Sequence, residues 1–121
     1  MKISQQISII EHDDSLRHTL KEVLIFHGFA VLTFRCVEDF LAQDNFALAD
    51  LILCDVNMEG MDGFQLVILL KNLNNNTPVI LMSGSLLVQE ETALELGAAA
   101  FMSKPFRLNE LLRQIEVCIA G

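Results

Sequence analysis

Short apolar runs alternate with longer amphipathic stretches along the whole of this 121-residue chain. Such an alternation is typical of β-α units arranged around a parallel sheet. The runs near the middle are apolar at successive positions, as strands covered by helices on both faces must be. The sequence therefore predicts an α/β fold with five strands, at Ile7–Ile10, Phe29–Phe34, Asp50–Cys54, Pro78–Met82 and Ala99–Met102.

The stretches between these runs have the spacing of amphipathic helices. The first helix is expected from Leu16 to His27, because its apolar residues recur at helical spacing and Gly28 follows as a stop signal. The length fits a single domain, so residues 1–121 are interpreted as one unit. The remaining helices are predicted at Val37–Ala42, Gly63–Leu73, Leu86–Leu96 and Leu108–Ile119.

The composition indicates a folded domain and argues against nucleic-acid binding and a membrane segment. Hydrophobic residues make up 52% of the chain and charged residues 20%, which is enough apolar material for a folded core. The formal net charge is −8 and no Lys/Arg cluster offsets it, so this domain is not expected to bind nucleic acid. No signal peptide and no apolar run of about 20 residues is present, which predicts a cytoplasmic protein without a membrane segment. The three cysteines fit a reducing compartment and are expected to be small buried hydrophobes.

Polar side chains with useful chemistry follow four of the five predicted strands. In an open parallel sheet the functional groups gather at the carboxyl ends of the strands, so these segments should converge. Acids can hold a hard divalent cation, while a hydroxyl and an ammonium can neutralise a phosphoryl group carried on a carboxylate. The first strand delivers Glu11, His12, Asp13 and Asp14, the third Asp55, the fourth Ser83, and the fifth Lys104 and Pro105.

From Ile7 to Ile119 the chain resembles the receiver domains of bacterial response regulators, the phosphoacceptor modules of two-component systems. The resemblance rests on Leu51-Ile52-Leu53-Cys54 ending in Asp55, the following Met58, Met61, Asp62 and Gly63, the Met82-Ser83-Gly84 segment, and Phe101 with Lys104-Pro105-Phe106. It implies a flavodoxin-like, doubly wound five-stranded parallel sheet in the order 2-1-3-4-5.

The same resemblance implies the roles of the site residues. Asp55 would be the phosphoacceptor for a sensor histidine kinase or a phosphotransfer protein. Lys104 would contact the acyl phosphate, Ser83 would be the switch hydroxyl and Phe101 the switch aromatic. Mg²⁺ would be the cofactor, with the backbone carbonyl of Asn57 as one ligand. The other metal ligands are expected among Glu11, His12, Asp13 and Asp55.

The acidic pair that usually follows the first strand of a receiver is altered here. An ungapped match places Glu11 and His12 at its two positions, so that His12 replaces the metal-binding acid. Because imidazole suits transition metals better than Mg²⁺, this register predicts weakened Mg²⁺ binding or compensation from Glu11 and Asp13. A register moved by two residues would instead make Asp13 and Asp14 the pair, and an outward-turned His12 is a further alternative.

Two more positions depart from the pattern. Glu59 stands where relatives commonly have proline, which predicts a freer loop with an added negative charge after Asp55. Phe101 lacks a phenolic hydroxyl, so any switching there must use the packing of the ring.

Three functions of different kinds remain open. The leading one is a phosphorylation-operated switch that changes a protein contact surface near the fourth helix. The second is a divergent receiver that acts as a constitutive binding module, which the His12 substitution favours. An aspartyl phosphohydrolase would carry a second acid two residues beyond Asp55, where Asn57 stands, so no enzyme is expected beyond self-catalysed phosphotransfer and dephosphorylation. Output domain, partner protein and homodimer formation are left open.

Overall fold

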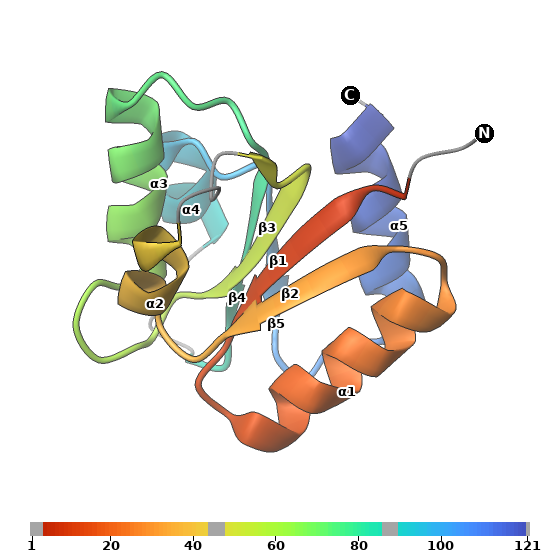
Figure 1. Ribbon diagram of the computed structural model, residues 1–121. Helices are drawn as coiled ribbons and strands as arrows, with labels where there is room; N and C mark the ends of the chain where they lie inside the picture. Colours follow the sequence, from red (N-terminus) through yellow and green to blue (C-terminus); the bar gives the residue numbers. More distant parts are fainter. Residues whose placement is uncertain (1–3, 44–47, 86–89, 121) are drawn as a thin grey trace.

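The computed structural model describes residues 4–43, 48–85 and 90–120. Strands and helices alternate along the chain (Figure 1). The elements are β1 (Gln6–Ile10), α1 (Asp14–Phe26), β2 (Ala30–Phe34), α2 (Val37–Ala42), β3 (Leu51–Asp55), α3 (Gly63–Asn72), β4 (Val79–Ser83), α4 (Glu90–Leu96), β5 (Ala100–Ser103) and α5 (Leu108–Ala120).

All five strands form one parallel sheet in the order β2-β1-β3-β4-β5. In Figure 1, α2, α3 and α4 lie on one side of this sheet and α1 and α5 on the other. Every crossover passes over a face of the sheet, so both faces are covered and the central strands exclude water. The predicted doubly wound α/β fold and its strand order are confirmed.

The core is divided by the sheet into two apolar clusters. One packs alternate residues of the strands, such as Ile10 and Leu81, against Leu66 and Leu70 of α3. The other packs the intervening residues against α1 and α5, with Leu20 and Ile115 among its members. The alternation of side chains along each strand thus explains why the central runs contain apolar residues at successive positions.

The predicted boundaries agree with the structure to within one or two residues for most elements. The predicted third strand stopped at Cys54, whereas β3 includes Asp55 as its last residue. The predicted fourth helix began at Leu86, and its first four residues lie outside the described part of the chain; α4 is described from Glu90.

Ser8 on β1 is a polar residue inside the apolar sheet. Its side chain is 1% exposed, and its hydroxyl has no hydrogen-bond partner among the described residues. A buried hydroxyl without a partner loses its hydrogen bonds to water on folding and gains nothing in exchange.

We predict that Ser8→Ala raises the free energy of unfolding by about 1 kcal/mol, because it removes this unpaired group. Urea denaturation followed by circular dichroism measures the change. Ser103→Ala, at an exposed serine of β5, is the matched control and should have little effect. A loss of stability in Ser8→Ala would show that the hydroxyl has a stabilising partner.

Candidate functional site

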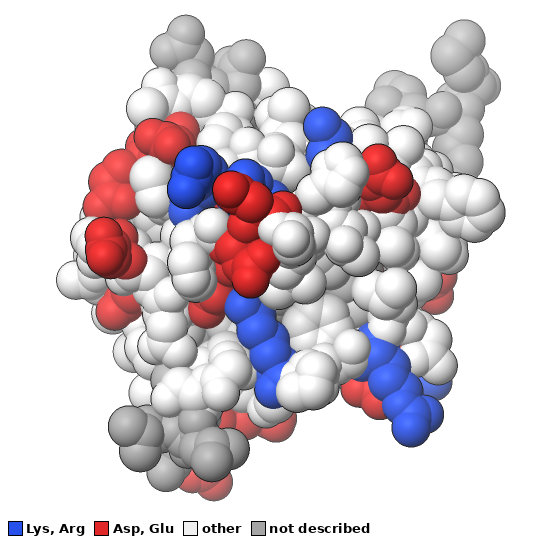
Figure 2. All heavy atoms as spheres, turned by 90° about the horizontal axis from the view of Figure 1, so that it is seen from below, with Lys and Arg blue, Asp and Glu red and all other residues white. Residues whose placement is uncertain are grey.

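The candidate site lies at the edge of the sheet where the strands end. Asp55 is the last residue of β3, Glu11 follows β1, and Lys104 follows β5. Figure 2 shows the molecule from this end, with acidic side chains gathered near the middle of the face and basic side chains beside them. Parallel strands bring their carboxyl ends to one edge, which is why residues far apart in sequence meet there.

Lys104 joins the two buried acids. Its Nζ donates hydrogen bonds to Oε1 of Glu11 at 2.6 Å and to Oδ2 of Asp55 at 2.7 Å. The side chains of Glu11 and Asp55 are 0% and 4% exposed, and that of Lys104 is 20% exposed. Burial alone would lower the pKa of the Lys104 ammonium, but the hydrogen bonds and charges of Asp55 and Glu11 together outweigh it and raise this pKa.

His12 stands beside this group, at the outer edge of the site. Its Nδ1 lies 3.2 Å from Oε2 of Glu11 and 3.8 Å from Oδ2 of Asp55, while its side chain remains 63% exposed. The His12 side chain is thus largely exposed, while its Nδ1 faces the two carboxylates. Glu11, His12 and Asp55 form a group whose candidate ligand atoms all lie within 4.8 Å of one another.

The side chains of Asp13 and Asp14 accept hydrogen bonds at the start of α1. Oδ1 of Asp13 accepts the N–H of Leu16 at 3.0 Å as the helix N-cap, and Asp14 pairs with Arg17 at 2.6 Å. The Arg17 hydrogen bond lowers the pKa of the exposed Asp14 carboxyl. This geometry favours the register in which Glu11 and His12, not Asp13 and Asp14, face Asp55. A metal-binding role for Asp13 remains a prediction.

Ser83 is the buried last residue of β4, at the edge of the sheet near Asp55. The side-chain amide of Asn57 donates to its hydroxyl oxygen at 3.0 Å, and the N–H of Ser85 donates to the same oxygen at 3.0 Å. The backbone N–H of Asn57 also donates to Oδ1 of Asp55 at 3.0 Å. Asn57 thus links the proposed phosphoacceptor to the proposed switch hydroxyl, a side-chain role that sequence reasoning missed.

The ring of Phe101 is half-buried on β5 and packs against the cluster on the α2, α3 and α4 side.

Cys54, next to Asp55, is fully buried, and burial raises the pKa of its thiol well above the usual value. It therefore behaves as the expected small hydrophobe. Cys36 and Cys118 are only half-buried, and the sulfur of Cys36 accepts the N–H of Asp39 as the N-cap of α2.

The loop between β3 and α3 is braced from α2. Oε2 of Glu38 accepts the backbone N–H of Met61 at 2.8 Å, a bond that lowers the pKa of Glu38. At the end of this loop Gly63 passes close to the site, and a Cβ there would lie 2.8 Å from the backbone oxygen of Asp55. Glu59 is exposed in the same loop. The brace from Glu38 was not predicted, because nothing in the spacing of the two segments indicates it.

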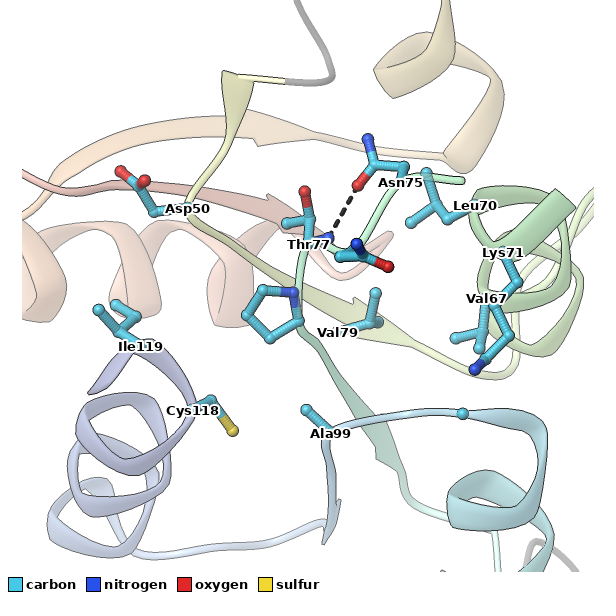
Figure 3. Close-up of a pocket in the computed structure, with 13 residues that line it drawn as sticks. Asp50, Val67, Leu70, Lys71, Asn75, Thr77, Val79, Ala99, Cys118 and Ile119 are labelled. Carbon is cyan, nitrogen blue, oxygen red and sulfur yellow. Dashed lines mark hydrogen bonds between the residues drawn. The ribbon is translucent and has the colours of Figure 1, made fainter. Parts of the chain in front are cut away.

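Two hollows on the surface differ in their relation to this site. One, of about 810 Å³, adjoins it and is lined in part by His12, Arg35, Asn57 and Met58. The other, of about 470 Å³, lies at the opposite edge of the sheet (Figure 3). Two of its polar side chains already hold backbone groups, since Asp50 accepts the N–H of Gln6 and Asn75 that of Thr77. Of these two hollows, the first is the one that adjoins the candidate site.

The donor set fits a divalent cation, but it fits Mg²⁺ only in part. Two buried carboxylates offer the oxygen ligands that Mg²⁺ prefers, and the backbone carbonyl of Asn57 remains a predicted further ligand. His12 offers an imidazole nitrogen as the third candidate ligand. This nitrogen suits a transition metal better than a hard cation.

The carboxyl edge of this doubly wound sheet thus holds two carboxylates, an ammonium and a hydroxyl. The model of the response regulator receiver domain matches residues 7–116, and the chain belongs to this family. The chain is 31% identical over 119 residues to the regulatory protein VirG of Agrobacterium tumefaciens, covering 95% of this chain and 43% of that protein.

The transcriptional regulatory protein TctD of Salmonella typhimurium is 34% identical over 110 residues, which cover 88% of this chain and 48% of TctD. The chain thus spans less than half the length of either relative. Among solved structures, the non-phosphorylated HemR receiver domain of Leptospira biflexa superposes with a TM-score of 0.84 at 29% identity, over 98% of this chain and 96% of that one. None of the helices in the described ranges is long and apolar enough to cross a membrane.

We predict that Lys104→Met lowers the free energy of unfolding at neutral pH by roughly 2–4 kcal/mol, because it leaves two buried carboxylates without their shared cation. The raised pKa of Lys104 means that its stabilisation is complete below about pH 10 and is lost as the pH rises through the folded-state value.

Chemical denaturation at pH 7 measures this loss. Lys21→Met, at an exposed lysine of α1, controls for removal of a positive charge elsewhere. Equal effects of the two substitutions would contradict a specific role of the Lys104 bridge.

Proposed function

We propose that this domain accepts a phosphoryl group on Asp55 from a sensor histidine kinase or a histidine phosphotransfer protein, and that the modification changes a protein contact surface. The observation that carries the proposal is the bridge from Lys104 to the buried carboxylates of Glu11 and Asp55. Buried carboxylates that share an ammonium at the carboxyl edge of an α/β sheet are suited to binding a phosphoryl group and compensating its charge.

The chemistry requires one displacement at phosphorus. An oxygen of Asp55 forms the new O–P bond while the P–N bond of the donor phosphohistidine breaks. The imidazole leaves with the electron pair of that bond and takes up a proton. Lys104 stays in contact with the modified side chain and offsets its charge, and the N–H of Asn57 holds the carboxylate in position. A divalent cation bound at Glu11 and Asp55 would add charge compensation when present.

The donor reaches Asp55 from the hollow of about 810 Å³ beside the site. The Asp55 side chain itself is only 4% exposed, so the phosphoryl group must pass residues at the wall of this hollow. His12 and Asn57 line it and also lie next to Asp55. The hollow thus provides a route for a single side chain of a partner protein.

The signal then passes through Ser83. Its hydroxyl is held by the Asn57 amide in this structure, and a phosphoryl group on Asp55 offers acceptor oxygens for it instead. A shift of Ser83 would disturb β4, the packing of Phe101 and the adjoining surface of α4, β5 and α5. The apolar run from Leu86 to Val88, at the start of the predicted fourth helix, lies outside the described residues.

A second function rests on one specific observation, the imidazole of His12 in the acidic site. A receiver that no longer binds Mg²⁺ well could serve as a constitutive binding module, without phosphorylation. A phosphohydrolase activity has no such support, because Asn57 stands where a second acid would act. The length of VirG and TctD favours an output domain or partner protein as the recipient of the signal.

We predict that Asp55→Asn abolishes the mass gain of one phosphoryl group on incubation with a small phosphodonor such as acetyl phosphate. The amide oxygen of asparagine is too poor a nucleophile to replace the carboxylate. Intact-mass spectrometry of the full chain measures the result. Asp14→Asn is the control and should be labelled like the unmodified protein, because Asp14 is exposed and paired with Arg17. Labelling of Asp55→Asn would refute the site, and no labelling of the unmodified protein with any phosphodonor would favour the binding module.

We also predict that the domain binds Mg²⁺ weakly and that His12→Asp tightens this binding about tenfold or more. Tenfold tighter binding corresponds to about 1.4 kcal/mol of binding free energy, which is the gain we expect when a carboxylate oxygen replaces an imidazole nitrogen as a Mg²⁺ ligand. Isothermal titration with Mg²⁺ measures the affinity, and Asp14→Asn should leave it unchanged. Loss of Mg²⁺ binding in Asp14→Asn, with no effect of His12→Asp, would show that Asp13 and Asp14 form the acidic pair.

A further inference from the structure

We propose that Glu11, His12 and Asp55 form a binding site for a divalent cation of the Co²⁺, Ni²⁺ and Zn²⁺ class, with Nδ1 of His12 as a ligand. The inference deepens the proposed function. The use of the ion in phosphorylation rests on that function, whereas the binding itself can be measured without it.

His12 lies close enough to both carboxylates to share an ion with them. Nδ1 of His12 lies 3.2 Å from Oε2 of Glu11 and 3.8 Å from Oδ2 of Asp55. Two ligand atoms that share an ion at about 2.0–2.2 Å lie no more than about 4.4 Å apart. Both separations are therefore compatible with an ion that His12 shares with either carboxylate, and the candidate ligand atoms of all three side chains lie within 4.8 Å of one another.

The buried groups of the site have an excess of negative charge. Two carboxylates with side chains 0% and 4% exposed share the single ammonium of Lys104, so the buried group has a formal excess of one negative charge. Each carboxylate uses one oxygen for Lys104 and the other for a backbone N–H, of Asp13 at 3.1 Å or Asn57 at 3.0 Å. These hydrogen bonds orient the carboxylates without removing the excess charge. A divalent cation beside them would more than offset it.

The chemistry of the donors selects the class of ion. Mg²⁺ takes oxygen ligands and gives up its water reluctantly, so an imidazole nitrogen contributes little to its binding. Co²⁺, Ni²⁺ and Zn²⁺ accept imidazole and carboxylate together. The imidazole nitrogen of His12 is thus a poor ligand for Mg²⁺ but a suitable ligand for a transition-metal ion.

The other two histidines provide internal comparisons. Nε2 of His18 lies 3.2 Å from Oε1 of Glu22, but both side chains are more than two-thirds exposed and they make a pair without a third donor in the groups described. Nδ1 of His27 lies 2.9 Å from the backbone oxygen of Val23. Neither has a buried carboxylate beside it, so His12 has the stronger environment for a metal ion.

The experiment titrates the full chain with Co²⁺ and, separately, with Mg²⁺, without a phosphodonor. The variants are His12→Ala, His12→Asp and the matched control His18→Ala. A Cys36→Ser variant tests the half-buried thiol that lines the same surface hollow as His12. His12 is 63% exposed, so its substitution should not prevent folding, and circular dichroism verifies this.

We expect Co²⁺ affinity to fall at least tenfold in His12→Ala and to stay within twofold of the original in His18→Ala and Cys36→Ser. His12→Asp should lower the ratio of Co²⁺ to Mg²⁺ affinity at least tenfold. This ratio is decisive because most ligand sets favour Co²⁺ over Mg²⁺ to some degree. With Zn²⁺, nitrogen NMR of the imidazoles should show a large shift for Nδ1 of His12 and little change at His18 or His27.

Equal Co²⁺ affinity in His12→Ala and the original protein would overturn the proposal, as would loss of Co²⁺ binding in His18→Ala or Cys36→Ser. An unchanged Co²⁺ to Mg²⁺ ratio in His12→Asp would also overturn it. Phosphorylation of Asp55 is measured independently by mass. A labelled protein without His12-dependent Co²⁺ binding rejects this inference alone, and an unlabelled protein with such binding rejects only the proposed phosphorylation.

Discussion

The ammonium of Lys104 between two buried carboxylates is the interaction on which the rest of the site depends. Glu11 follows β1, Asp55 ends β3 and Lys104 follows β5, so one side chain ties together the ends of three strands. Two buried carboxylates without a cation between them would repel each other at a large cost in free energy. The strand order β2-β1-β3-β4-β5 places β3 near the middle of the sheet, where residues from both sides can reach Asp55.

The surrounding loops are held by hydrogen bonds that start from the helices. Arg17 of α1 donates to the backbone oxygen of Glu11 at 2.8 Å, and Glu38 of α2 accepts the N–H of Met61. Asn57 spans the distance from Asp55 to Ser83 with its backbone and side chain. The loops after β1 and β3 are therefore held in place before any partner arrives, and the second is joined to the end of β4. Such preorganisation is the main contribution that a protein can make to phosphoryl transfer.

The periodicity of the sequence was sufficient to predict an α/β fold with five strands around a parallel sheet, whereas the strand order was predicted from the resemblance to receiver domains. Apolar strands and amphipathic helices have different periods, and the strand ends showed where Glu11, Asp55, Ser83 and Lys104 would gather. The roles of side chains in loops were harder to predict. Whether Asp13 faces the site or caps α1 depends on the path of three residues, and hydrophobic patterns carry no information about that path. The Glu38 brace joins residues 23 positions apart through a backbone N–H, which no residue type at Met61 reveals.

His12 changes the charge of the site as well as its ligand chemistry. Two acids after β1, together with Asp55, would leave a formal excess of two negative charges over Lys104, whereas Glu11 and Asp55 alone leave an excess of one. The electrostatic attraction for any divalent cation is then smaller, so the identity of the ligand atoms decides more of the affinity. A phosphoryl group on Asp55 would replace its single charge by one of about −2 and restore the missing attraction. Cation binding and phosphorylation should therefore be coupled, because each reduces the charge imbalance that the other creates.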